Sequence, residues 1–162
     1  MTPRPETLIL CLGNDLRADD AVGWKVADRL ESAPPPGAIV RKSALSGMYL
    51  LDELIDFDRV IVVDAVQTRA GTPGDVLSFG IAGLESPPGP SPHAIGLPTV
   101  LRIARRYGLR LPSRIDVVAI EVADVETLGC GLTAPVAAAV PRAELLVRQL
   151  VAEAVPEPEP LR

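Results

Sequence analysis

The sequence has only two cysteines and 3% aromatic residues, and no apolar run approaches the roughly 20 residues that span a bilayer. Cys11 and Cys130 stand alone, without Cys-x-x-Cys spacing, which argues against a disulfide framework or a zinc cluster. No basic segment followed by a long hydrophobic core opens the chain, as a secretory signal requires. These absences predict a cytoplasmic protein with no membrane partner.

Positive charge is also scarce, because 16 Lys and Arg residues face 21 Asp and Glu residues, for a formal net charge of -5. Nucleic-acid binders gather Lys and Arg to displace counterions, so the sequence predicts no nucleic-acid partner. A chain of 162 residues can bury about two-thirds of its unfolded surface without a disulfide or a structural metal, so any metal would serve function. We expect a monomer with one domain over residues 1–155 and a disordered Pro/Glu tail over 156–162.

Short runs of aliphatic and β-branched residues predict strands that are covered on both faces. Residues 7–13, 59–66 and 115–122 are expected to form central, parallel strands, and residues 38–45 and 74–80 outer strands. Apolar residues recur at helical spacing over residues 20–30, 48–54, 94–107 and 142–154. This alternation predicts an α/β fold, a three-layer α/β/α domain with a mostly parallel, twisted central sheet of about five strands.

Four polar side chains map to the carboxyl edge of this sheet, where open α/β folds bind their ligands. Asp19 and Asp20 follow the first strand, Asp64 ends the apolar part of the second central run, and His93 follows the proline-rich loop 86–92. Two carboxylates and one imidazole could form a metal site with open positions for water or substrate. Oxygen and nitrogen ligands of this kind suit a borderline divalent ion such as Ni²⁺ or Zn²⁺.

Each of these residues also has an ordinary structural explanation. Asp is a favoured helix N-cap, which suits Asp19, and the helix dipole favours an acid such as Asp20 in the first turn. Asp64 could bond to the backbone, and His93 could be an exposed loop residue or cap a helix. A cysteine nucleophile is a weaker hypothesis, because Cys11 precedes the strand end and suits a packed apolar position. Spacing alone leaves these alternatives open.

Several segments together resemble the hydrogenase maturation endopeptidase family over residues 7 to 150. They are "LCLGNDLRADDAVGWKVADRL", "SGMYLLDEL", "RVIVVDAVQTRAGTPGDVLSF", "SPHAIGLPTVLRIA", "IDVVAIEV" and "GLTAPVAAAV". The resemblance implies a protease that removes the C-terminal extension from the large-subunit precursor of a [NiFe]-hydrogenase after nickel insertion.

The resemblance also implies the site residues. Asp20, Asp64 and His93 would be both the metal ligands and the catalytic residues, and nickel supplied by the precursor would be the metal, with other divalent ions able to substitute. Asp19 would shape and cap the turn, and Asp15 would be a solvent-facing loop acid.

Two positions depart from the family pattern, which often has glycine where Cys11 and Ala21 stand, and both changes leave the three ligands untouched. Two mechanisms remain open at this point: the metal acts as a Lewis acid, or it licenses docking while Asp20 or Asp64 acts as general base. Met48, in "SGM", either shapes the substrate groove or packs in the core. A noncatalytic nickel-dependent chaperone or binding module is the main alternative function, and a small-molecule hydrolase is a third.

Overall fold

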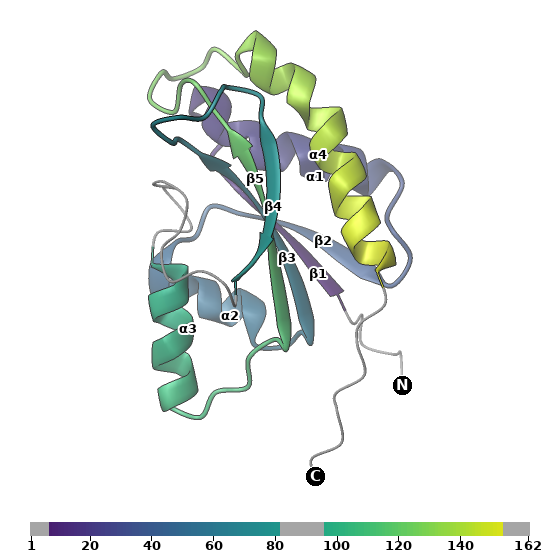
Figure 1. Cartoon of the computed structure of the whole chain (residues 1–162), viewed down its shortest axis with the longest axis vertical. Coiled ribbons are helices and arrows are strands. Elements are labelled where there is room, and N and C mark those ends of the chain that lie inside the picture. Colours follow the sequence, from purple (N-terminus) through teal and green to yellow (C-terminus); the bar gives the residue numbers. More distant parts are fainter. Residues whose placement is uncertain (1–6, 82–95, 154–162) are drawn as a thin grey trace.

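The computed structural model describes residues 7–81 and 96–153, which fold around a five-stranded sheet (Figure 1). The strand order is β2-β1-β3-β5-β4, and every neighbouring pair is parallel except β4 with β5. The strands are β1 (Thr7–Leu12), β2 (Ala38–Ser43), β3 (Arg59–Val66), β4 (Val76–Gly80) and β5 (Arg114–Glu121). The predicted central strands and outer strands are therefore confirmed.

Helices cover both faces of the sheet and complete the three layers (Figure 1). The helices α1 and α4 pack together on one face, whereas the 3-10 helix η2, α2 and α3 lie on the other. Their bounds are η1 (Ala18–Ala21), α1 (Val22–Ser32), η2 (Gly47–Leu50), α2 (Leu51–Leu54), α3 (Leu97–Arg106) and α4 (Ala134–Ala152). No helix within the two described segments is long and apolar enough to cross a membrane.

The central strands are buried on both faces because each one alternates its side chains between two apolar layers. In β3, Ile61 and Val63 pack toward α1 and α4, while Val60 and Val62 pack toward α2 and α3. All eight residues of β3 are buried. Continuous aliphatic runs are typical of such two-sided strands, and burial on this scale is the main stabilising contribution to the fold.

The last helix begins earlier than the sequence predicts, at Ala134 rather than near 142. The helix contains Pro141, and a proline inside a helix removes one hydrogen bond and crowds the preceding turn. The helix nevertheless continues through Pro141, since Val136, Ala139, Val140 and Ala143 are all buried against the sheet. Packing of that apolar stripe outweighs the local cost of the proline.

The carboxyl end of α4 is tied to the amino end of the sheet by a buried arginine. Arg59 is 1% exposed and donates hydrogen bonds to the carbonyl oxygens of Leu150 and Glu153 and to the carboxylate of Asp116. A cation is favourable where the last carbonyl groups of a helix lack intrahelical partners. The expected tail, residues 156–162, lies outside the described residues, as does the end of the predicted domain at 155.

Candidate active site

The carboxyl ends of β1 and β3 bring two of the predicted acids to one edge of the sheet. Asp64 follows Val63, which pairs across the ladder with Cys11, and Cys11 comes two residues before Gly13. The 3-10 helix η1, which carries Asp20, contacts β3. Segments 44 residues apart in sequence therefore meet at this edge.

Asp64 is fully buried within β3, which continues for two residues beyond it to Val66. Its side chain shares a sheet face with Val62 and Val66, the face covered by α2 and α3. One carboxylate oxygen accepts a hydrogen bond of 2.9 Å from the Ala65 N–H. A buried carboxylate is costly unless it is paired, so its position at the end of an apolar strand requires a specific partner.

Asp20 is 3% exposed and is held at the end of β1 by its own backbone. Its carbonyl oxygen accepts a 3.1 Å hydrogen bond from the Asn14 N–H. Gly13 makes this close approach possible, because a Cβ at that position would lie 2.5 Å from the same oxygen. The turn after β1 therefore fixes the backbone of Asp20 against the strand end.

Asp19 has a different role from the one predicted. It caps neither η1 nor α1, because neither helix has a side-chain cap. Its fully buried carboxylate instead accepts hydrogen bonds from the N–H groups of Ala123 and Asp124, and from the N–H and hydroxyl of Thr133. Asp15 is exposed, as predicted.

The bonds of Asp19 join the turn after β1 to both ends of the connection between β5 and α4. Thr133 is the N-cap residue of α4, so the carboxylate lies where the helix dipole favours a negative charge. Asp19 therefore links the turn after β1 to the segment after β5 and to the start of α4, and it fixes the backbone next to Asp20.

The third predicted ligand, His93, lies outside the described residues, together with the proline-rich loop 86–92. It precedes Gly96, the N-cap of α3, by three positions. The described helix α3 begins at Leu97, inside the predicted range 94–107, and Leu97 packs in the same apolar layer as Val62 and Val66. Among the residues that the structure describes, no three His, Cys, Asp or Glu side chains form a metal-binding group.

Sequence reasoning missed a further buried acid at this edge, Glu121. It is 4% exposed, ends β5 and pairs with Val66 across the β3–β5 ladder. Its two oxygens accept hydrogen bonds from the N–H of Thr68, at 2.6 Å, and from the Thr68 hydroxyl, at 3.0 Å. The signal was present in the sequence, since Glu121 follows an apolar strand just as Asp64 does. Its bonds hold the loop after β3 in place.

Exposed apolar side chains surround this edge. Leu16 and Leu128 lie on loops after β1 and β5 that are joined by a hydrogen bond from the Gly129 N–H to the Leu16 carbonyl, and Met48 and Tyr49 lie after β2. Their exposed fractions range from 50% to 72%. Met48 therefore does not pack in the core, and the alternative prediction that it does is wrong.

Cys11 does not act as a nucleophile in this site. Cys11 is fully buried, and burial raises the pKa of its thiol far above the ordinary value, so the reactive thiolate is disfavoured. It packs with Ile9 and Val63 as a small apolar side chain, as predicted. Cys130 is exposed, and neither residue forms a disulfide.

Trp24 offers a spectroscopic test of metal binding at Asp20. Its indole N–H donates to the Ser43 carbonyl, and a Cβ on Gly13 would lie 3.2 Å from its ring. Gly13 is thus in close contact with both Trp24 and the Asp20 backbone. We expect Ni²⁺ bound at Asp20 to change the fluorescence of Trp24, the only tryptophan, and the change to disappear in Asp20→Ala. Wild-type emission that stays constant while calorimetry reports saturation would contradict metal binding near Asp20.

Comparisons with known proteins agree with this architecture. The model of the hydrogenase maturation protease family matches residues 40–150. The hydrogenase expression/formation protein HupD of Rhizobium leguminosarum bv. viciae is 30% identical over 153 residues, which cover 91% of this chain and 75% of that protein. The family match includes the positions of Asp64 and His93 and begins after Asp20.

Solved structures extend the similarity to three dimensions. The hydrogenase maturating endopeptidase HybD from E. coli superimposes with a TM-score of 0.72 at 28% identity, covering 88% of this chain and 89% of that one. The [NiFe] hydrogenase maturation protease HybD from Thermococcus kodakarensis gives a TM-score of 0.68 at 25% identity, covering 90% and 98%. Sequence and fold thus agree, and the chain belongs to the hydrogenase maturation protease family.

Proposed function

We propose that this protease removes the C-terminal extension of a [NiFe]-hydrogenase large-subunit precursor after nickel insertion, and that Asp20, Asp64 and His93 recognise the nickel. The observation that carries the proposal is the burial of two carboxylates, Asp20 and Asp64, on neighbouring segments at the carboxyl edge of the sheet. Relatives named as maturation proteases of [NiFe] hydrogenase support the substrate class.

The donor chemistry of these residues fits a divalent ion. Carboxylate oxygens and an imidazole nitrogen are ordinary ligands of borderline metals, and three protein ligands leave positions for substrate. Asp64 is rigidly placed because it belongs to a buried strand, and Asp20 is fixed by the Asn14 bond to its carbonyl. His93 would complete the set from the segment before α3.

Nickel in the precursor would supply a Lewis acid for the scissile peptide. The protein's own residues would bind that nickel, align the peptide beside it and keep bulk water from the carboxylates. If a carboxylate of Asp20 or Asp64 is not fully occupied by the metal, it can accept a proton from the attacking water. The two mechanisms inferred from the sequence both use the same three residues.

The apolar rim supports a macromolecular substrate rather than a small one. The exposed side chains of Leu16, Met48, Tyr49 and Leu128 surround the carboxyl edge that carries the two acids. Clusters of exposed apolar side chains are typical of protein-binding sites. A folded precursor would cover them when its C-terminal segment enters the site.

The test is to mix the protein with its cognate precursor, with and without nickel, and to measure the mass of the precursor in each sample by intact mass spectrometry. We expect one C-terminal peptide to be lost from the nickel-loaded precursor only, and His93→Ala to abolish the loss while keeping the melting temperature. Nickel-dependent association without a mass change would replace the proposal with a binding module. Cleavage of nickel-free precursor at the same rate would contradict nickel recognition.

A further inference from the structure

The outer face of α3 carries an unusual concentration of positive charge. No Asp or Glu occurs between positions 86 and 115, whereas this stretch contains five arginines. The rest of the chain then holds 11 basic and 21 acidic residues. The segment 86–115 is therefore strongly positive, although the protein as a whole is acidic.

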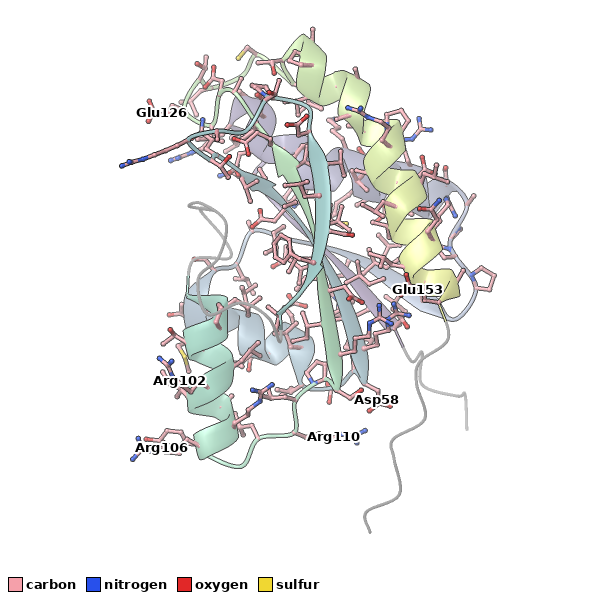
Figure 2. All side chains as sticks on the ribbon, viewed as in Figure 1. Asp58, Arg102, Arg106, Arg110, Glu126 and Glu153 are labelled. Atoms are coloured by element: carbon pink, nitrogen blue, oxygen red, sulfur yellow. The ribbon has the colours of Figure 1, made fainter. Side chains whose placement is uncertain are left out.

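Four of these arginines are exposed on α3 and on the segment after it: Arg102, Arg105, Arg106 and Arg110. Arg102 and Arg106 point outward from the helix, and Arg110 extends from the segment that follows (Figure 2). Within the described part of the chain, Arg102, Arg105 and Arg106 have no ion-pair partner, whereas Arg110 pairs with Asp58 at the amino end of β3. The charge of the helix is therefore largely uncompensated.

Helix electrostatics explain only part of this pattern. Cations in the last turn are favoured by the helix dipole, which accounts for Arg105 and Arg106. The dipole does not account for Arg102 in the middle of the helix or for Arg110 beyond its end. The opposite face of the helix is buried and holds the helix that carries these arginines in place. Its buried residues are Leu97, Val100, Leu101 and Ala104.

Exposed apolar and aromatic side chains lie among the arginines. Tyr107 is 79% exposed, and Ile103 and Leu109 are partly exposed. Arg and Tyr are the residue types that most often dominate protein–protein binding energy. A nucleic-acid binder would also gather an excess of Lys and Arg over the whole protein, whereas this chain has a formal net charge of -5. This composition favours a protein partner over a nucleic acid.

We infer that this surface of α3, formed by Arg102, Ile103, Arg106, Tyr107 and Arg110, docks an acidic surface of the precursor outside the cleavage site. The inference rests on the proposed function. The helix starts at the carboxyl edge beside the candidate site and runs antiparallel to β3 (Figure 1), toward Asp58 (Figure 2). A partner whose C-terminal segment enters the site can therefore lie along α3. A symmetric dimer through this face would oppose like charges, which disfavours a second copy of this chain.

The experiment measures cleavage of the nickel-loaded precursor by Arg102→Glu, Arg106→Glu and the double variant over a range of salt concentrations. At low salt we expect the double variant to raise KM about tenfold with kcat unchanged, because rim charges act mainly on association. The difference should disappear near 1 M salt, where the Debye length is about 3 Å. Arg102→Lys should behave as wild type.

The matched control is Lys25→Glu, which makes the same charge change on the exposed surface of α1. Equal KM values for the double variant and wild type at low salt would overturn the docking surface while leaving the protease function intact. If Lys25→Glu raises KM as much as Arg102→Glu does, the effect comes from net charge alone. This result would also overturn the docking surface.

Binding assays separate the inference from the proposed function. If wild type does not cleave the precursor but binds it, and the double variant loses that binding, the surface stands and the proposed cleavage fails. If wild type neither cleaves nor binds the precursor, both fail. Loss of binding to phosphatidylserine vesicles in the double variant, with unchanged precursor kinetics, would assign the surface to a lipid headgroup instead.

Discussion

Replacing Asp64 with asparagine is expected to lower the rate of precursor cleavage at least about 100-fold while leaving the fold intact. The substitution keeps the volume of the side chain and one carbonyl oxygen, which can still accept the 2.9 Å hydrogen bond from the Ala65 N–H. It removes the negative charge and one anionic oxygen. Metal binding or proton acceptance at this position would be lost in either mechanism.

The measurement is a single-turnover cleavage assay on nickel-loaded precursor, with thermal unfolding of each variant beside it. Because the buried shape is preserved, the free energy of unfolding should change by at most about 1 kcal/mol. Asp52→Asn, at an exposed position of α2, is the control and should cleave as wild type does. Cleavage by Asp64→Asn within a factor of three of wild type would show that its charge is not needed.

The central strands could be predicted because a strand that is buried on both faces appears in the sequence as a continuous aliphatic run. The bounds of β3 match the predicted run 59–66, since a short aliphatic stretch rich in β-branched residues is typical of a strand buried on both faces. The start of α4 could not be foreseen, because Pro141 reads locally as a helix boundary and only contacts with the sheet overrule it.

In the candidate site, too, the features set by the local sequence could be predicted, and the contacts between residues far apart in sequence could not. Asp20 and Asp64 could be placed at one sheet edge because strand ends of a parallel sheet converge there. The partners of Asp19 could not be foreseen, because its hydrogen bonds join residues 104 to 114 positions apart. A capping residue and a buried link between loops look identical in sequence, since both are an Asp before a helix.

Loss of the Asp19 carboxylate is expected to cost more stability than any surface change in this protein. In Asp19→Ala, the N–H groups of Ala123, Asp124 and Thr133 lose their acceptor together with the Thr133 hydroxyl. Breaking one side of a buried charged network costs about 3–5 kcal/mol. We therefore expect the free energy of unfolding, measured by urea denaturation, to fall by about that amount.

Two further variants test whether the effect comes from this network. Asp15→Ala, an exposed acid in the same loop, should change stability by less than about 0.5 kcal/mol. Thr133→Val removes the hydroxyl but keeps the N–H, so it should cost about 1–2 kcal/mol, and its effect should not add to that of Asp19→Ala. Additive costs would mean that the two residues act independently. The network also fixes the backbone beside Asp20, so Asp19→Ala should slow cleavage even at temperatures where the variant remains folded.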